Sequence, residues 1–454
     1  MSDITPLPHF PTSDSDRRQF MKAAGAAALA ASYAGSARGA GIDPAQKLKV
    51  GFIGTGGRGT GAAAQALSAD DNVELWSVGD VFQDRIDTAL KSLGADKKIA
   101  SKVNVPAERQ FVGLDAYKRV LDSGVDVVLL TTSPGFRPLH LRAALEAGKH
   151  VFAEKPMAVD AEGVRHVYET LKMFEGKPLA ILAGFCWRYS PSRREAYKKV
   201  MEEGLIGDVT GVYATYYSNH SKPHLNPSER PAGMSDVEWQ IRNWYNYTWL
   251  GGGGLVEQAV HSVDKIGWVM GDESPISCRA TGGLAAPQLG GNIFDHYHVA
   301  YEYPNNVWCH LASRKAPGCF NENADYVRGT KGTLVIGRGT APYIQDNDGK
   351  QIWTYRLPRG QSEPNMYQVE HDEFFASIRS GEHMNNGPRM IHSTMMAIMG
   401  RMSAQTGQEI TWEQAMAAKE DLFPSEETIK WDQSFEPQPV AIPGVTTIPG
   451  IGKA

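Results

Sequence analysis

One stretch of this sequence decides the fold: Val50-Gly51-Phe52-Ile53-Gly54-Thr55-Gly56-Gly57-Arg58-Gly59, an apolar strand pattern that runs directly into the glycine pattern G-x-G-x-x-G. The helix-forming run 62–67 follows it. In such a strand–turn–helix the first glycine makes the tight turn, the second lets the backbone approach a pyrophosphate, and the third lets the helix pack closely. The helix N-terminus favours the negative charge. We therefore predict a dinucleotide site at Gly54, Gly56, Gly57, Arg58 and Gly59.

An acidic residue at the expected distance supports this prediction. Asp80 closes a second apolar run, 73–80, whereas a glycine triplet alone also occurs in ordinary turns. A carboxylate at about this offset accepts hydrogen bonds from the ribose hydroxyls and repels the 2′-phosphate of NADP. Asp80 therefore predicts NAD as the cofactor, and the neighbouring Arg85 leaves NADP open as the less favoured alternative.

The composition bounds the class of protein. The chain has 454 residues, of which 42% are hydrophobic and 21% charged, and this is enough for two domains with separate cores. The formal net charge is -5, with Lys and Arg scattered among the acids, so the sequence offers no basic face for nucleic acid. No segment is long and apolar enough to predict a membrane span.

The first forty residues differ from the rest. The pair Arg17-Arg18, followed by Phe20 and the Ala/Gly-rich run 23–34, is typical of a twin-arginine export signal. The alternative is an amphipathic leader on a cytoplasmic protein. We predict a signal over residues 1–40 and export by the twin-arginine machinery to the periplasm or another extracytoplasmic space.

The four cysteines show no C-x-x-C pair, so they predict neither a zinc site nor a redox motif. We expect buried thiols, and a Cys309–Cys319 bridge stays open for an oxidising compartment. No metal site is predicted.

Apolar runs alternate with helical patterns up to about Gly184, with strands expected at 49–53, 73–78, 125–130, 150–153 and 179–184. This alternation predicts an α/β fold with a doubly wound parallel sheet, a Rossmann domain over 46–188, and ligands at the carboxyl ends of its strands. Beyond it, a helix at 192–203 and strand patterns at 209–217, 296–301 and 334–336 predict an α+β domain with a largely antiparallel open sheet over 189–422. A Pro-rich surface tail is expected over 423–454.

The order of the motifs resembles the Gfo/Idh/MocA family of nicotinamide-dependent sugar and cyclitol oxidoreductases over roughly residues 47–422. The motifs that carry the resemblance are the glycine pattern, Asp80, Thr132-Ser133-Pro134 with His140, Glu154-Lys155-Pro156, and the segments 184–191, 252–264, 329–334 and 371–381. The resemblance implies that Thr132, Pro134, His140 and Glu154 bind the cofactor, that Lys155 transfers the proton, and that the open sheet face serves contacts in a homo-oligomer. Two departures concern the substrate: Glu257 replaces the usual Asp, and Ala259 the usual Gly.

Three polar residues share one face of an expected helix. Glu257, His261 and Asp264 are spaced by four and three residues, which places them one turn apart. With Lys155, which Pro156 helps to orient, Glu257 and His261 form a predicted acid/base array. The alternatives are a solvated polar stripe, a Glu/His metal pair, and an ordinary surface lysine.

The expected substrate wall consists of Arg188, Tyr189, Trp244 and Asp264, although aromatic residues are more often core. We predict an NAD(P)-dependent oxidoreductase that transfers a hydride between the nicotinamide and a secondary alcohol of a sugar, glycoside or cyclitol. One alternative is an NAD-dependent glycoside hydrolase that oxidises the sugar only transiently. Another is a nucleotide-binding sensor without catalysis.

Overall fold

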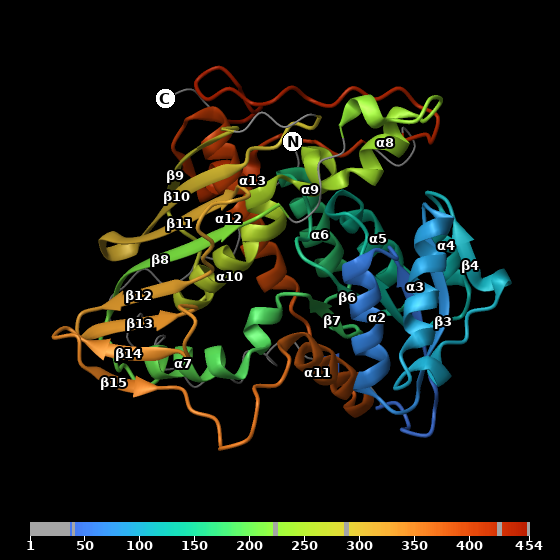
Figure 1. Ribbon diagram of the computed structural model, residues 1–454, viewed down its shortest axis with the longest axis horizontal. Coiled ribbons are helices and arrows are strands. Elements are labelled where there is room, and N and C mark those ends of the chain that lie inside the picture. The colour runs from blue at the N-terminus through green and yellow to red at the C-terminus, as the bar shows by residue number, and fades with distance from the viewer. Residues whose placement is uncertain (1–36, 39–40, 221–225, 286–289, 425–428, 452–454) are drawn as a thin grey trace.

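The computed structural model describes residues 37–38, 41–220, 226–285, 290–424 and 429–451 (Figure 1). The predicted export signal therefore lies outside the described residues, apart from the short strand β1 (Ala37–Arg38), which pairs antiparallel with β16 (Glu382–His383). The rest of the chain builds two large sheets with helices between them (Figure 1). None of the helices among the described residues is long and apolar enough to cross a membrane.

The first sheet has six strands in the order β4-β3-β2-β5-β6-β7, and all of its pairs are parallel. Its strands are β2 (Leu48–Ile53), β3 (Val73–Asp80), β4 (Gln110–Val112), β5 (Val127–Leu130), β6 (His150–Ala153) and β7 (Ile181–Ala183). Five of the six were expected from the sequence. The exception is β4, because three residues are too few to show an alternation.

Helices cover both faces of this sheet, which explains its continuous apolar strands. They are α2 (Gly57–Ala69), α3 (Gln83–Ala95), α4 (Ala116–Asp122), α5 (Arg137–Glu146) and α6 (Ala161–Met173). On β5, Val128 and Leu130 pack into the core that includes α5 and α6, whereas Val127 and Leu129 pack into the core that includes α2 and α3. The predicted Rossmann architecture is confirmed.

The second sheet has nine strands in the order β15-β14-β13-β12-β8-β11-β10-β9-β17, and only β8 and β11 pair in parallel. Its strands are β8 (Val209–Ser218), β9 (Ser277–Gly283), β10 (His296–Tyr303), β11 (Val307–Lys315), β12 (Asp325–Gly329), β13 (Gly332–Ile336), β14 (Tyr343–Asp346), β15 (Gln351–Thr354) and β17 (Ile410–Thr411). The predicted, largely antiparallel sheet is confirmed.

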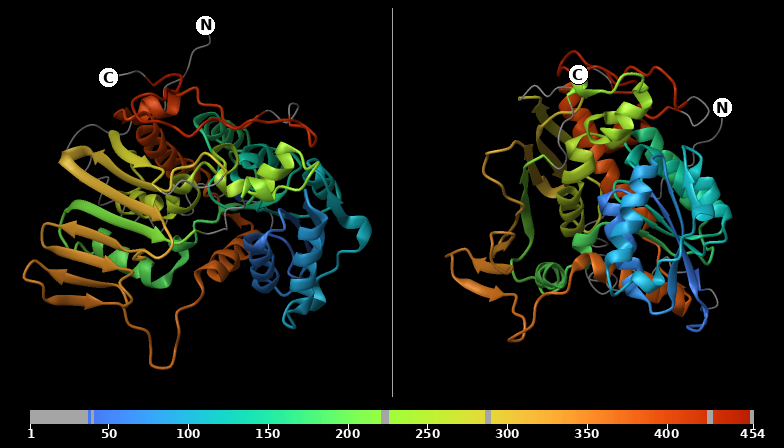
Figure 2. Two further views of the ribbon diagram at one scale, coloured as in Figure 1. Left: turned by 45° about the horizontal axis from the view of Figure 1, so that its top comes forward. Right: turned by 45° about the vertical axis from the view of Figure 1, so that its right-hand side comes forward.

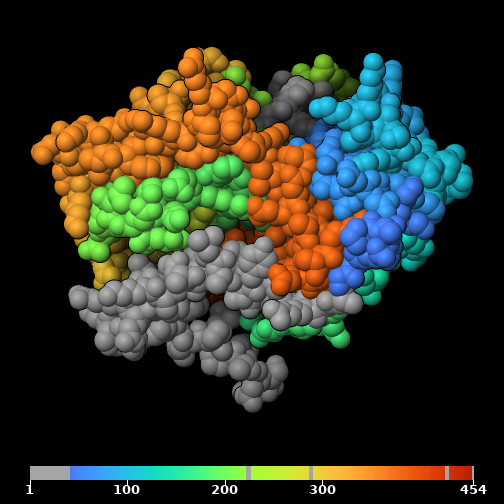
Figure 3. Space-filling view, turned by 90° about the horizontal axis from the view of Figure 1, so that it is seen from below, coloured from blue at the N-terminus to red at the C-terminus, as the bar shows by residue number. Residues whose placement is uncertain are grey.

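The helices of the second half pack against both sheets. They are α7 (Pro191–Met201), α8 (Asp236–Arg242), α9 (Thr248–Gly251), α10 (Val260–Val269), α11 (Met366–Ser380), α12 (Gly387–Thr406) and α13 (Trp412–Ala417). Helix α12 lies against both α10 and α6, and α11 lies against α2, with Phe374 and Phe375 in the same core as Phe52. On the surface, the late part of the chain, drawn in orange, lies directly beside the N-terminal part, drawn in blue (Figure 3). These late helices are therefore part of the packing of the Rossmann half, although they fall within the predicted second domain 189–422.

The segment after α13 is anchored to the body of the protein rather than free. It runs over the surface past α8 (Figures 1 and 2). Its aromatic rings pack edge-on or tilted against three residues of the body: Phe423 against Phe136 at 4.9 Å, Trp431 against Phe82 at 5.6 Å, and Phe435 against Trp249 at 5.0 Å. The expected surface tail thus lies at the surface, and its aromatic side chains attach it to the body of the protein, because each of them buries a large apolar area.

All four cysteines are free thiols; Cys186, Cys278 and Cys309 are buried and Cys319 is exposed. The Cys309–Cys319 bridge that the sequence left open is absent.

Candidate active site

The glycine loop between β2 and α2 leaves room for a ligand. Helix α2 begins without a side-chain cap at Gly56, and a Cβ placed on Gly56 or Gly57 would meet no atom within 4 Å. In contrast, a Cβ on Gly59 would lie 2.3 Å from the carbonyl oxygen of Gly54, and Gly54 has a φ of 91°. The loop thus combines a tight turn, close packing and an open mouth at a helix N-terminus, which fits a dinucleotide pyrophosphate.

Asp80 is fixed at the end of β3 by the same loop. Its Oδ2 accepts hydrogen bonds from the backbone N–H of Thr55 at 2.6 Å and the Thr55 hydroxyl at 3.0 Å, and its Oδ1 accepts one from the N–H of Phe82 at 3.0 Å. Burial raises the pKa of Asp80, against the effect of these donors. The carboxylate therefore stands where the ribose is expected, with a defined orientation.

Arg58 turns away from the mouth of the loop. Its guanidinium donates to Glu154 Oε1 at 2.5 Å, to Gln65 Oε1 at 2.9 Å and to Glu370 Oε1 at 3.4 Å. It also lies over the ring of Tyr367, 4.6 Å from its centre. Arg58 thus forms an ion pair that orients Glu154, and its contact with the cofactor stays a prediction.

Glu154 lies at the end of β6, where it is 6% exposed. A Cβ on Gly184 would lie only 2.9 Å from Glu154 Oε2, so that glycine gives the carboxylate its space. The charge of Arg58 lowers the pKa of Glu154 in spite of burial, whereas burial and Glu154 raise the pKa of the neighbouring Glu370. Glu154 is therefore the ionised member of this pair.

Arg137 is a site residue that the sequence analysis missed. Its buried guanidinium donates to the carbonyl oxygens of Leu130 at 3.0 Å, Thr132 at 2.5 Å and Glu154. Burial lowers its pKa to about 10. Arg137 ties the ends of β5 and β6 together, and no sequence motif distinguishes it from other arginines.

His140 lies behind the cofactor edge. Its ring is 4% exposed and packs against Tyr117 and Phe136, with centroid distances of 4.3 and 5.7 Å. Burial lowers its pKa to about 3, and Nδ1 lies 3.2 Å from the Thr132 hydroxyl. His140 thus contacts Thr132 from within the core, while Thr132 and the buried Pro134 lie just beyond the end of β5, and a contact of His140 with the cofactor stays a prediction.

Lys155 and Glu257 meet across the two halves of the molecule. Lys155 follows β6 and is joined to Pro156 by a cis peptide bond. Its Nζ donates to the backbone carbonyl oxygen of Glu257 at 2.5 Å and to Glu257 Oε1 at 3.3 Å. The side chains are only 11% and 13% exposed. The acid/base array predicted from the sequence thus contains a direct lysine–carboxylate pair.

The helix that carries Glu257 differs from the expected α-helix. Residues Leu255–Ala259 form a π-helical turn, and α10 begins only at Val260. Such turns are rare and frequently mark functional sites. The sequence spacing of Glu257 and His261 could not reveal it, since a spacing of four residues places side chains on about one face in either type of helix.

Two polar atoms of this array have no partner within the described residues. Glu257 Oε2 and His261 Nδ1 are buried without a hydrogen bond. Burial, and after it the charge of Lys155, lower the pKa of His261 well below its usual range, so the imidazole is neutral. Buried polar atoms normally find partners, so these two mark a place where a ligand is expected.

Arg188 and Asp264, both predicted as substrate contacts, pair with each other inside the protein. Arg188 Nε donates to the Asp264 carboxylate at 2.9 and 3.0 Å, and its Nη1 and Nη2 donate to Asp272 at 3.1 and 2.5 Å. Asp264 also accepts from the Ser393 hydroxyl at 2.7 Å. Every guanidinium nitrogen is therefore used inside the protein.

The two aromatic candidates differ from each other. Tyr189 is 5% exposed, and its hydroxyl accepts a hydrogen bond from Asn386 Nδ2 at 2.9 Å, so it belongs to the core that includes α11. Trp244 is half-buried and lies beside Tyr245, with ring centroids 5.6 Å apart. Within the predicted substrate wall, Trp244 is therefore the residue with the most exposed side chain.

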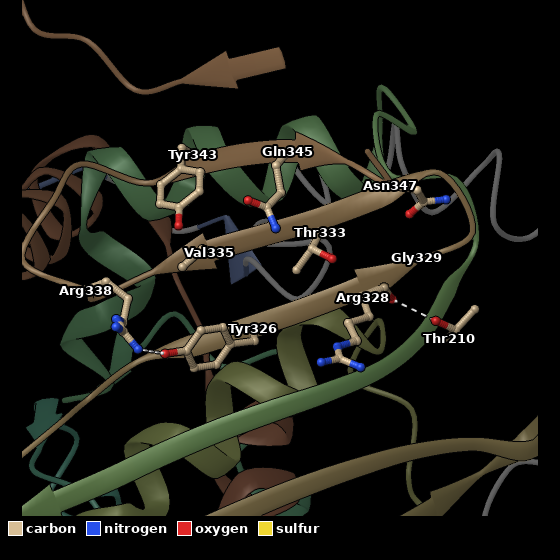
Figure 4. A pocket seen from close by; sticks show the side chains of 10 residues that line it. All are labelled: Thr210, Tyr326, Arg328, Gly329, Thr333, Val335, Arg338, Tyr343, Gln345 and Asn347. Carbon is tan, nitrogen blue, oxygen red and sulfur yellow. Dashed lines mark hydrogen bonds between the residues drawn. The ribbon is translucent and has the colours of Figure 1, made fainter. Parts of the chain in front are cut away.

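A hollow on the outer face of the nine-stranded sheet lies apart from this array (Figure 4). Its volume is about 490 Å³, and it is lined by Thr210, Tyr326, Arg328, Gly329, Thr333, Val335, Arg338, Tyr343, Gln345 and Asn347. None of the predicted cofactor or catalytic residues is among them. Within the described part of the chain, no three His, Cys, Asp or Glu side chains are arranged to hold a metal ion.

A parallel six-stranded sheet with an open glycine loop, an acidic residue at the ribose position and a lysine–carboxylate pair at its strand ends defines a class: the Rossmann-fold oxidoreductases. Residues 48–177 match the family described as "Oxidoreductase family, NAD-binding Rossmann fold", and residues 195–335 match the "GFO/IDH/MocA C-terminal domain". The chain belongs to the Gfo/Idh/MocA family of NAD-binding oxidoreductases.

Curated relatives extend the likeness. The chain is 30% identical over 279 residues to the inositol 2-dehydrogenase of Azotobacter vinelandii, which is 58% of this chain and 71% of that enzyme. It is 25% identical over 341 residues to the myo-inositol 2-dehydrogenase of Thermotoga maritima, with coverages of 74% and 89%.

Solved structures share the fold. Levoglucosan dehydrogenase in complex with NADH and levoglucosan superposes with a TM-score of 0.64 at 20% identity, covering 81% of this chain and 99% of that one. The aldose-aldose oxidoreductase of Caulobacter crescentus gives a TM-score of 0.62 at 20% identity, with coverages of 81% and 100%.

Proposed function

We propose that this NAD-dependent oxidoreductase acts on a secondary alcohol of a sugar, glycoside or cyclitol. The observation that carries the proposal is the Lys155–Glu257 pair at the end of β6, with the buried, unpartnered Glu257 Oε2 beside it. The relatives named as inositol dehydrogenases and the fold neighbour named as levoglucosan dehydrogenase support a polyhydroxylated substrate.

The glycine loop and Asp80 would hold the NAD, which supplies hydride transfer when bound. The chain itself must hold the substrate and move a proton. In the oxidation direction Lys155 Nζ, as the neutral amine, takes the proton of the reacting hydroxyl, and in the reduction direction its ammonium form returns that proton. Glu257 Oε2 accepts a hydrogen bond from that hydroxyl or its neighbour. The neutral His261 can orient a further hydroxyl without adding charge.

The test is a substrate panel of inositols, anhydrosugars, aldoses and aryl glycosides, assayed for NADH absorbance and for released aglycone. We expect net formation or consumption of NADH with at least one polyol. Release of an aglycone without a lasting absorbance change would instead identify the redox-cycling glycoside hydrolase. If NAD binds but neither signal arises with any compound, the substrate proposal is wrong.

We also propose that the protein is exported by the twin-arginine route. Support comes from Arg17-Arg18 ahead of the Ala/Gly-rich run 23–34, and export in the folded state would let the protein carry its cofactor with it. Replacing both arginines by lysine should retain the protein in the cytoplasm in a fractionation assay, while Lys22→Arg should not. Unchanged export of the double variant would contradict the route.

A homo-oligomer that uses the outer face of the nine-stranded sheet remains a proposal from the family resemblance. Sedimentation of the purified protein, with Tyr343→Arg as a variant in the hollow on that face, tests it. A monomer for the wild type would overturn it.

A further inference from the structure

A second lysine lies beside the Lys155–Glu257 pair. Lys315 is the last residue of β11 and is 6% exposed. Its Nζ donates a hydrogen bond to Gln258 Oε1 and lies over the ring of Tyr245, 4.3 Å from the ring centre. A solvated surface lysine would have neither the burial nor these contacts.

The stem of Lys315 also occupies the space in front of the glycine run. A Cβ placed on Gly254 would lie 3.6 Å from Lys315 Cε and 3.8 Å from its Cδ. Gly254 directly precedes the π-helical turn Leu255–Ala259, so Lys315 lies near the start of this turn and contacts the turn at Gln258.

The two lysines hold consecutive residues of the same turn, one lysine from each half of the molecule. Lys155, at the end of β6 in the Rossmann half, binds the carbonyl and carboxylate of Glu257. Lys315, at the end of β11 in the other half, binds the side chain of Gln258. π-helical turns are rare, and here two consecutive residues of the turn are each held by a side chain from outside the helix.

We propose that Lys315 is a positioning residue of the active site: by holding Gln258 it keeps the π-helical turn in the conformation that presents Glu257 to Lys155 and to the substrate. This inference rests on the proposed role of the Lys155–Glu257 pair. Burial and, after it, the charge of Lys155 lower the pKa of Lys315 well below its usual range, which agrees with two amines close enough to interact.

The test uses the full-length protein with NAD and a substrate on which the wild type is active. In Lys315→Met, kcat should fall by about 10–100-fold, because a misplacement of about 1 Å in an active site costs up to about this much. The KM and the dissociation constant of NAD should stay within about twofold of the wild type, because the substitution removes no contact with the substrate or the cofactor. Lys350→Met, at an exposed position in the β14–β15 turn, is the matched control and should be unchanged.

Two further variants separate positioning from a merely structural role. Gln258→Leu should cause the same loss of kcat, and the double variant Lys315→Met/Gln258→Leu should be no slower than either single one, because both changes remove one interaction. Lys315→Arg should recover much of the rate, since it restores a donor to Gln258. If Lys315→Met fails to fold, Gln258→Leu and Lys315→Arg still decide the question.

Three results would overturn the inference: wild-type kcat in Lys315→Met, multiplying losses in the double variant, or a rise of KM alone, which would place Lys315 on the substrate instead. Lys155→Met distinguishes a failure of the proposed function from a failure of the positioning role of Lys315. If that variant also keeps its turnover, the proposed function of the pair fails; if it is inactive while Lys315→Met is fully active, only the positioning role fails.

Discussion

Two buried charge clusters start from the same stretch of chain and differ in how completely their polar atoms are satisfied. Around Glu257, Lys155 supplies one ammonium group, and Glu257 Oε2 and His261 Nδ1 have no partner within the described residues. Two turns further on, Asp264 and Asp272 use every nitrogen of Arg188.

This difference distinguishes the cluster around Glu257, which can bind a ligand, from the cluster around Arg188, which stabilises the fold. A buried ion pair with all its hydrogen bonds made has nothing left to offer a ligand, and removing one member leaves an uncompensated charge. A pair with a free carboxylate oxygen is less stable than it could be, but it can bind a hydroxyl group. Sequence spacing treats both clusters alike, because Glu257, His261 and Asp264 follow one helical repeat.

The largest expected effect concerns the cluster of Lys155, Glu257 and His261, which we call the open cluster because two of its polar atoms have no partner within the described residues. Lys155→Met should lower kcat by about 10²–10⁴-fold, the usual loss when a general acid or base is removed. Because Lys155 is not needed for the glycine loop or Asp80, NAD binding measured by titration calorimetry should be unchanged. A variant with near-wild-type turnover would show that this cluster is only a polar stripe.

The cluster of Arg188, Asp264 and Asp272, which we call the closed cluster because every nitrogen of Arg188 has a partner, should lose stability rather than catalytic rate when it is changed. Arg188→Met leaves Asp264 and Asp272 buried without their partner, so the free energy of unfolding should fall by about 3–5 kcal/mol in urea titrations. Molecules that stay folded should still bind NAD. Arg142→Met is a control, since its ion pair with Glu146 is far more exposed and should cost less than about 1 kcal/mol. If Arg188→Met lost activity while its free energy of unfolding stayed that of the wild type, Arg188 would instead be a substrate-binding residue.

The smallest expected effect concerns pH. Burial lowers the pKa of His371 to about 4, below its usual 6.5, so the folded state binds fewer protons than the unfolded one between these values. Its stabilisation is complete above pH 6.5 and is lost as the pH falls towards 4, by up to about 1.4 kcal/mol per pH unit.

The closed cluster should not contribute in this window. Arg188 and Arg389 lower the pKa of Asp272 against the effect of burial, so its contribution is lost only below its ordinary value of 3.8. Urea unfolding at pH 7 and pH 5 should therefore show a shallower pH dependence for His371→Gln and an unchanged one for Asp272→Asn. Equal slopes in His371→Gln and the wild type would contradict this assignment.

Local patterns were sufficient for the Rossmann half. Apolar runs bounded by turns predicted five of its six strands, and the glycine spacing predicted the open loop, since a turn and a helix start depend on a few neighbouring residues. The polar residues at the strand ends follow from the same reasoning, because parallel strands bring their carboxyl ends to one edge. The exceptions are Arg58 and His140, whose side chains turn towards partners that are distant in the sequence or buried.

The sequence by itself therefore determined the fold class, the dinucleotide loop and the residues that form the Lys155–Glu257 pair. Only the tertiary structure decided which buried charged groups have all their hydrogen-bond partners and which have a polar atom without one. Lys315 reaches Gln258 from 57 residues away, Arg188 reaches Asp264 from 76 residues away, and Glu370 meets Arg58 across 312 residues. Such pairings depend on how helices and sheets pack against one another, and side-chain spacing along one element contains no information about the charge that an element of the other half will bring to it.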